Sequence, residues 1–147
     1  MTAQELKQLL DACALAGRIV DRLPVLPKGM RPSHIHVLDA VYEICRSQGE
    51  CRVSDVSARL NVTTPGITRL IGELEAAGML EKQESSQDRR VTLLRLTAGG
   101  MECVDTYVIQ LHSRWAKKLQ DVSGGQVREA VQVIKRLWET IPGKRGE

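Results

Sequence analysis

Aromatic residues are scarce in this sequence: phenylalanine is absent, and two tyrosines and two tryptophans complete the set. A folded core must therefore be built from aliphatic side chains. Long apolar runs are lacking as well, and no stretch approaches the roughly 18 apolar residues that a membrane span needs. The first residues mix charges early, without the unbroken apolar run and small-residue cleavage pattern of a secretory signal. We therefore expect a cytoplasmic protein with no membrane-spanning segment.

Cysteine motifs are also missing, because none of the four cysteines forms a Cys-x-x-Cys pair. A disulfide framework is not expected in a cytosolic chain of this size, so we expect buried free thiols. Cys51, which lies between Glu50 and Arg52 in a predicted loop, would be the most accessible of them. A thiol-switched regulator acting through Cys51 is therefore one alternative function.

The patterns of metal and catalytic sites are absent too. His34 and His36 are two positions apart on a predicted helix, so they point to nearly opposite sides and cannot share a metal. His112 has Val108 and Ala116 at the four-residue positions where a second helical ligand would lie. The chain has no glycine-rich phosphate loop and no activated-serine motif. We therefore expect no metal, no cofactor and no enzymatic activity.

The net charge of +3 is compatible with nucleic-acid binding but too small to predict it. Between residues 53 and 97 the basic and acidic residues are equal in number. The placement of the charges is more informative than their sum. The first turn of the helix predicted from Pro65 to Ala77 contains no acidic residue, and both of its glutamates fall in its second half.

Residues 53–97 have the pattern of a helix-turn-helix followed by a hairpin. A short helix is predicted for Ser54–Leu60, a tight connection for Asn61–Thr64 and a second helix for Pro65–Ala77. Gly78 is predicted to stop this second helix. Apolar residues recur along it at i, i+3, i+4 and i+7, which is typical of an amphipathic helix. They are Ile67, Leu70, Ile71 and Leu74.

Two strands are predicted after this helix, at Leu80–Glu84 and Val91–Leu96, with a polar tip between them. The sequence therefore predicts a winged helix-turn-helix, in which the second helix enters the major groove of DNA and the hairpin follows the backbone. Asp88 at the tip would hold a neighbouring arginine in position through a charge-assisted hydrogen bond. The alternative interpretation of the tip is a solvated turn.

The run from Val62 to Leu70 contains most of the residues that are predicted to contact DNA. Thr63 or Thr64 can cap the helix, whose first amides then face a phosphate. Gly66 removes a side chain where the helix comes closest to the groove, and Arg69 can bind guanine through two hydrogen bonds. The alternative is that the threonines simply cap a surface helix. The residues predicted to contact DNA are Thr63, Thr64, Pro65, Gly66, Thr68, Arg69, Arg89 and Arg90.

Amphipathic helices flank this unit. One is predicted for Glu5–Leu23, and a second begins at Ser33 as its cap and runs to about Ser47. A long helix capped by Thr97 extends to about Leu119. Ser123 and Gln126 have the spacing of a capping box that opens a last helix.

A monomer of this length would struggle to cover the apolar faces of the N-terminal helix and the two C-terminal helices. We expect a symmetric homodimer with recognition helices about 10 bp apart on DNA. The fold class is mainly α with a small β-hairpin wing. We divide the chain into an N-terminal dimerisation helix with its Pro-rich connection (1–32), the winged helix-turn-helix (33–100) and C-terminal dimerisation helices (101–147), all in one intertwined domain.

The chain resembles the MarR family of bacterial transcriptional regulators over nearly its full length. The resemblance is carried by Leu60–Thr63, Ile67–Leu70, Leu74–Leu80, Asp88–Arg90 and Leu96–Thr97 followed by Gly100. It implies an obligate dimer, a palindromic operator in double-stranded DNA and, usually, repression.

The resemblance also implies release from DNA by a small anionic aromatic compound, for which Arg18 and His36 lie on the pocket-lining helices. A surface role for Arg18 and a packed, hydrogen-bonded role for His36 are the alternatives. The chain departs from the family at Gly72-Glu73, where the family often has Asp-Arg, so a cation is missing from the DNA face.

The leading hypothesis is a dimeric, sequence-specific DNA-binding transcriptional repressor of a nearby operon. Besides the thiol switch, the alternative is a winged-helix protein-interaction module that lacks DNA affinity. The equal numbers of charges in residues 53–97 and the glutamate at position 73 favour this alternative.

Overall fold

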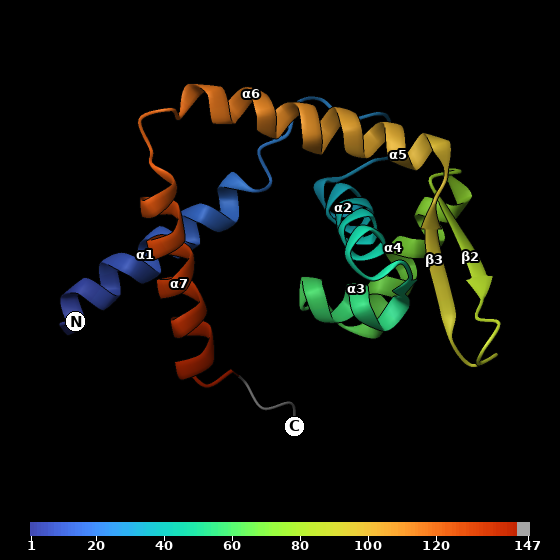
Figure 1. The fold of residues 1–147 in the computed structure, drawn as a ribbon, viewed down its shortest axis with the longest axis horizontal. Helices are drawn as coiled ribbons and strands as arrows, with labels where there is room; N and C mark the ends of the chain where they lie inside the picture. The colour runs from blue at the N-terminus through green and yellow to red at the C-terminus, as the bar shows by residue number, and fades with distance from the viewer. Residues whose placement is uncertain (144–147) are drawn as a thin grey trace. The chain divides into compact units, whose positions relative to one another are not determined.

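The computed structural model describes residues 1–143 and divides into two compact units, Met1–Leu111 and His112–Glu147. Residues 144–147, at the end of the region expected to dimerise, lie outside the described part. Figure 1 traces the elements in chain order. They are α1 (Ala3–Ile19), α2 (Pro32–Gln48), β1 (Cys51–Arg52), α3 (Val53–Leu60), α4 (Thr64–Ala76), β2 (Leu80–Glu84), β3 (Thr92–Leu96), α5 (Ala98–Val104), η1 (Asp105–Ile109), α6 (Gln110–Lys118) and α7 (Gly124–Thr140).

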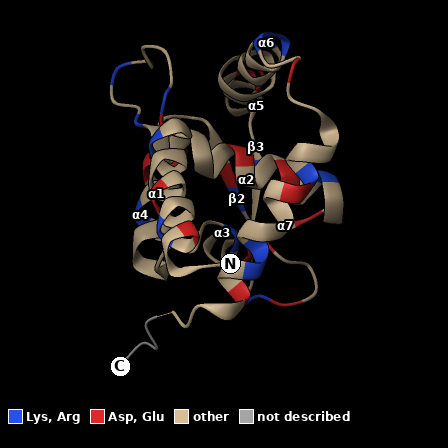
Figure 2. Cartoon of the chain, turned by 90° about the vertical axis from the view of Figure 1, so that its left-hand side faces the viewer, with Lys and Arg blue, Asp and Glu red and all other residues tan. Residues whose placement is uncertain are grey.

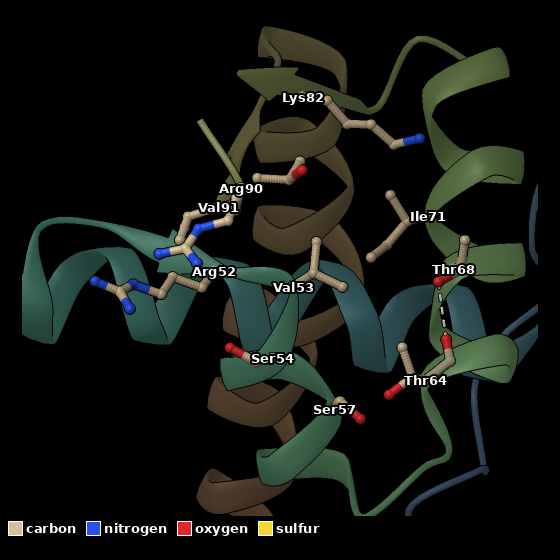
Figure 3. A pocket seen from close by; sticks show the side chains of 11 residues that line it. Arg52, Val53, Ser54, Ser57, Thr64, Thr68, Ile71, Lys82, Arg90 and Val91 are labelled. Atoms are coloured by element: carbon tan, nitrogen blue, oxygen red, sulfur yellow. Dashed lines mark hydrogen bonds between the residues drawn. The ribbon is translucent and has the colours of Figure 1, made fainter. Parts of the chain in front are cut away.

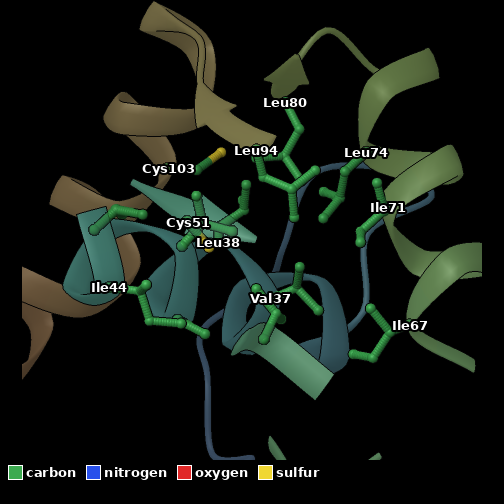
Figure 4. Packing of buried hydrophobic residues seen from close by; sticks show 14 residues of the cluster. Val37, Leu38, Ile44, Cys51, Ile67, Ile71, Leu74, Leu80, Leu94 and Cys103 are labelled. Atoms are coloured by element: carbon green, nitrogen blue, oxygen red, sulfur yellow. The ribbon is translucent and has the colours of Figure 1, made fainter. Parts of the chain in front are cut away.

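The core of the first unit is aliphatic, as the lack of aromatic residues predicts. Figure 4 shows labelled side chains from α2, α4 and the sheet gathered in one interior. Complete burial of a Val, Leu or Ile side chain contributes about 1.5–3 kcal/mol. The central helix is α2, which packs on α3, α4, α5 and β3. Its buried residues are His34, Ile35, Val37, Leu38, Ala40, Val41 and Ile44.

The recognition-helix stripe is confirmed. Ile67, Ile71 and Leu74 are fully buried, and Leu70 packs against the same cluster. The helix ends at Ala76, before Gly78, whose φ of 74° lies in the left-handed region that glycine tolerates. The predicted stop is therefore also confirmed.

The hairpin forms in the predicted place, with Leu80 opposite Leu96 and Glu84 opposite Thr92. The sheet has the order β1-β3-β2, so a third strand, β1, lies on the other side of β3. We expected only a connection there. Cys51 pairs with Leu94 and Arg52 with Leu93. A strand of two residues is too short to produce an alternating pattern, which explains why the sequence did not predict it.

Several of the predicted helix boundaries differ from the structure, by one residue at the start of α3 and at both ends of α4. Ser33 does not cap α2: the N-cap is Arg31 and the first helical residue is Pro32. Proline suits this position because the amide that it lacks has no partner within the helix. The first helix begins earlier than predicted, since Thr2 and Glu5 form a capping box, and it ends at Ile19.

The caps of the C-terminal helices are confirmed. Thr97 Oγ1 accepts a hydrogen bond from the Gly100 amide at 3.1 Å, and Ser123 and Gln126 form the predicted capping box. The helix after Thr97 is not uniformly α-helical, however. A π-helical turn, η1, separates α5 from α6, and the side-chain Nε2 of Gln110 donates to the Asp105 carboxylate across it at 2.6 Å. Met101, Val104, Val108 and Leu111 recur every three to four positions across this turn, so the sequence pattern gave no sign of it.

Helices α1 and α7 each lack a buried residue, although apolar side chains recur along both. Leu10, Leu15 and Ile19 of α1 are about half exposed, as are Val127, Val131 and Ile134 of α7. Within residues 1–143 no helix combines the length and the apolar character needed to cross a membrane.

Candidate nucleic-acid interface

A tight turn joins α3 to the recognition helix α4. Asn61 adopts a left-handed conformation with φ of 52°, which asparagine tolerates better than most residues. The Ser57 hydroxyl donates to the Val62 carbonyl at 2.7 Å, and the Val62 amide donates to the Ser57 carbonyl at 3.2 Å. These bonds fix the angle at which α4 leaves the turn.

The first turn of α4 is capped by Thr63, one of the two predicted caps. Its hydroxyl accepts from the Gly66 amide at 3.4 Å, and its carbonyl accepts from Ile67 at 3.0 Å. Pro65 follows at the start of the helix. A Cβ at Gly66 would lie 3.1 Å from Val62 Cγ1, so local packing also favours glycine there. The helix therefore begins as the sequence predicts, with its small residues at the exposed end.

Two side chains extend from this helix into solvent. The Thr68 hydroxyl donates to the Thr64 carbonyl at 2.9 Å, which leaves its oxygen free to accept a hydrogen bond. The Arg69 side chain is 74% exposed, and its Nε donates to Glu73 Oε1 at 3.1 Å. Arg69 is therefore oriented by its own helix while most of its guanidinium group faces solvent.

The wing tip has the predicted carboxylate–arginine contact, and the arginine involved is Arg90. Asp88 Oδ1 accepts from the Arg90 amide at 3.0 Å and from its Nε at 3.2 Å, while Oδ2 accepts from Nη2 at 3.2 Å. These hydrogen bonds hold the pKa of Asp88 below its usual value. The Arg90 side chain is 90% exposed, so it remains accessible from solvent although Asp88 holds it in place. Arg89 is exposed next to it.

A hollow of about 430 Å³ opens between α3, α4 and the hairpin. Figure 3 shows Arg52 and Arg90 on one side of it, with Lys82 reaching in from β2. Hydroxyl groups complete its polar lining, and no acidic residue lines it. Two of these cations pair with carboxylates that do not line the hollow: Glu75 lies 3.5 Å from Lys82 Nζ, and Asp88 binds Arg90. The hydroxyl residues are Ser54, Ser57, Thr64, Thr68 and Thr92.

Sequence reasoning missed Arg52 and Lys82. Lys82 was counted among the charges of residues 53–97, and Arg52 lies just before them, but nothing in their sequence neighbourhood marks them as members of one site. Arg52 ends the short strand β1 and caps α3, and Lys82 lies in the middle of β2. Figure 2 shows basic and acidic residues mixed on the same elements, so the cationic lining depends on how these elements fold together.

Comparison with known proteins agrees with this geometry. The model of the MarR family matches residues 28–91, which include α2, the helix-turn-helix and most of the wing. The winged helix of this chain is thus similar to the MarR family.

A curated relative is the uncharacterized HTH-type transcriptional regulator YdgJ of Bacillus subtilis (strain 168). It is 26% identical over 113 residues, which cover 77% of this chain and 66% of the relative. The relatives found by sequence are thus transcriptional regulators.

Solved structures of transcriptional regulators match almost the whole chain. The S. aureus MepR–DNA complex has a TM-score of 0.68 at 15% identity and covers 97% of this chain and 99% of that one. The PcaV transcriptional regulator from Streptomyces coelicolor, solved with its natural ligand, has a TM-score of 0.63 at 18% identity, covering 93% and 91%. At these identities the likeness establishes the fold, and the predicted winged helix-turn-helix is confirmed.

The thiol that we expected to be the most accessible, that of Cys51, is not accessible. Cys51 is 0% exposed, because β1 places it in the core opposite Leu94. Burial, followed by the nearby thiol of Cys45, raises the pKa of Cys51 to about 12. A thiol kept protonated and covered is a poor nucleophile, so the prediction that Cys51 is the most accessible thiol was wrong.

The two residues suggested for effector binding lie on different helices, Arg18 on α1 and His36 on α2. Arg18 is exposed in the last turn of α1. His36, on α2, is about one-third exposed, and its Nε2 lies 2.8 Å from Asp21 Oδ1. This contact matches the hydrogen-bonded alternative for His36, and the effector role of both residues stays a prediction.

Proposed function

We propose that this chain is a dimeric, sequence-specific DNA-binding transcriptional regulator that represses a nearby operon. One observation supports the proposal most strongly. Thr68 of α4 and the anchored Arg90 of the wing line a hollow that has a cationic and hydroxyl lining, and Arg69 is exposed on the same helix as Thr68. Since such a regulator acts on chromosomal DNA, the proposal also places it in the cytoplasm.

The hollow has a natural occupant in this proposal. If α4 occupies the major groove and the wing reaches the adjacent minor groove, the strand separating these grooves must pass between them. Its phosphates would meet Arg52, Lys82 and Arg90. Phosphate contacts of this kind fix the register and orientation of a protein on the duplex, whereas base contacts specify sequence. We therefore assign register to this cationic trio and base reading to Thr68 and Arg69.

The dimer is supported by the uncovered helices. A surface helix normally buries its apolar stripe, yet neither α1 nor α7 has a buried residue. A second copy of the chain would cover these stripes and would present two recognition helices to half-sites about 10 bp apart in a palindromic operator. Sedimentation equilibrium tests this proposal, and a monomer at micromolar concentration would refute it.

Control by a small molecule is the third part of the proposal. The structural neighbours include a regulator solved with its natural ligand and another solved with DNA. We propose that a small anionic aromatic compound releases this chain from DNA, with Arg18 and His36 as candidate contacts. Titrating such compounds into the protein–DNA complex would test this effect.

The decisive experiment is binding to the DNA upstream of the chain's own gene, compared with a scrambled duplex at physiological salt. Replacing Arg69 with Gln should reduce discrimination between sequences by about 1–3 kcal/mol, whereas Arg90→Gln should weaken binding to all sequences. Arg95→Gln is the matched control, because Arg95 is exposed on the hairpin but does not line the hollow. Equal affinity of the wild-type protein for both duplexes would refute sequence-specific binding.

If no duplex were bound at all, the protein-interaction module would be favoured instead. That alternative predicts a stable complex with another protein.

A further inference from the structure

Glu73 in the middle of α4 is the meeting point of three donors from two helices. Its Oε1 accepts from Arg69 Nε at 3.1 Å. Its Oε2 accepts from Arg31 Nη2 at 2.9 Å and lies 2.6 Å from His34 Nε2. Arg31 and His34 belong to the start of α2, about forty positions earlier in the chain. The carboxylate therefore joins the first turn of α2 to the DNA-facing helix.

The ring of His34 fixes this carboxylate. Its Nδ1 accepts a hydrogen bond from the Arg31 amide at 2.9 Å, so Nδ1 carries no proton. The proton of the neutral ring is then on Nε2, which donates to Glu73 Oε2. The His34 side chain is 4% exposed, and a buried ring with both nitrogens bonded has little freedom to turn. Glu73 is thus held by a rigid partner, His34, which belongs to α2.

Without this partner, Glu73 would hold Arg69 only weakly. An exposed ion pair four residues apart on a helix is worth about 0.3–0.5 kcal/mol, and acid before base is the better order. Here the arginine comes first. Because His34 fixes the Glu73 carboxylate, Arg69 forms its hydrogen bond to an acceptor that does not move, and the pair is no longer weak.

The contact uses one edge of the guanidinium group and spares the other. Glu73 takes Nε, and the two Nη atoms form the edge that can bind O6 and N7 of a guanine. We propose that Glu73 is a positioning residue that fixes the Arg69 side chain with its Nη edge toward a base, and so sets sequence specificity. The inference rests on the proposed DNA-binding function and deepens it.

A carboxylate near DNA would ordinarily repel phosphates, but this one is compensated. Arg31 and Arg69 together carry one more charge than Glu73 cancels. The hydrogen bond from His34, with help from Arg69 and Arg31, keeps the pKa of Glu73 below its usual value. The carboxylate therefore stays ionised at neutral pH and keeps hold of Arg69. Glu73, which favoured a protein-interaction module when only the sequence was considered, is thus part of the proposed base-reading site.

The test compares Glu73→Gln with the wild-type protein on its operator, on operators carrying single base changes, and on a scrambled duplex. We expect the ratio of operator affinity to scrambled affinity to fall about tenfold, within the range for loss of one bidentate base contact. Affinity for the scrambled duplex should hold or rise, because a negative charge is lost. The discrimination should be lost at one base position.

A double-mutant cycle separates positioning from a general effect of charge. Arg69→Lys keeps the positive charge but lacks the pair of Nη atoms that can bind guanine. Adding Glu73→Gln to this variant should therefore reduce the ratio of operator affinity to scrambled affinity no further. Glu81→Gln, which removes an exposed carboxylate paired with Arg95 on the hairpin, is the matched control and should leave the ratio unchanged. If Glu73→Gln does not fold, Glu73→Asp tests the same point, since its shorter side chain cannot bridge α2 and Arg69 together.

An unchanged ratio in a folded Glu73 variant would overturn the inference while leaving the proposed function intact. An equal loss of affinity for both duplexes would also overturn it, because a merely structural role predicts that result. If the wild-type protein itself showed no preference for its operator, the proposed function would fail and this inference with it.

Discussion

Replacing Gly100 with alanine should destabilise the winged helix, although alanine is the better helix former. Gly100 is buried in α5, and a Cβ at this position would lie 2.1 Å from the Met79 carbonyl oxygen and 3.1 Å from its carbon. These are backbone atoms, and the same oxygen accepts a hydrogen bond from the Thr97 amide at 3.1 Å. Neither α5 nor the start of β2 can therefore move aside without breaking a contact.

The expected magnitude follows from two opposing effects. Alanine in place of glycine inside a helix gains about 0.5–1 kcal/mol. Overpacking a well-packed site costs about 1–3 kcal/mol, and the overlap at Gly100 belongs at the upper end because the obstacle is backbone. We expect a net decrease of about 2 kcal/mol in the free energy of unfolding.

The adjacent glycine supplies a matched control. A Cβ at Gly99 would meet its nearest atom, the Gly78 carbonyl oxygen, at 3.5 Å, which is ordinary contact. Urea unfolding followed by circular dichroism at one fixed protein concentration should therefore rank Gly99→Ala well above Gly100→Ala. If the two variants were equally stable, the close approach of α5 to Met79 would be refuted.

Four further outcomes are expected. Gly72→Ala should stabilise the chain by about 0.5–1 kcal/mol in urea unfolding, because a Cβ there meets nothing within 4 Å; a loss of stability would contradict this. Cys51, whose pKa is raised to about 12, should be alkylated at neutral pH only as fast as the protein opens, as mapped by mass spectrometry. Arg52→Gln should lower the salt dependence of DNA binding by about one unit of slope while Arg95→Gln leaves it unchanged. Because the folded pKa of Glu73 is lowered from 4.5, the stability it contributes is full above that pH and is lost as the pH falls below it, so Glu73→Gln should flatten this acid decline in urea titrations.

The sequence predicted the long elements well because helical periodicity is a local signal. The apolar stripe of α4 lies in the core, the hairpin strands fall in place, and Thr97 and Ser123 act as caps. Misjudged features were short or depended on a single residue. The two-residue strand β1 has no periodicity, and missing it led directly to the wrong environment for Cys51. The apolar spacing likewise runs through the π-helical turn without a break and does not reveal it.

The candidate site was predicted where it lies on one element and missed where it is assembled from several. Arg69 and the Asp88–Arg90 contact are local, so spacing alone suggested them. Arg52 and Lys82 reach the hollow only because β1 and β2 flank β3. The proposed role of Glu73 depends on His34, which belongs to another helix. In the sequence Glu73 marked only the absence of a cation, whereas in the structure it binds Arg69.

The aliphatic core has a practical consequence for spectroscopy. Both tryptophans, Trp115 and Trp138, lie in the unit formed by residues 112–147, whereas both tyrosines lie in the first unit. Emission excited at the red edge of the absorption band therefore comes from the C-terminal helices alone. Trp138 is 72% exposed, so its spectrum should shift toward the blue if a second copy covers it. The chain thus carries a built-in reporter of subunit association that is silent about the DNA-reading half.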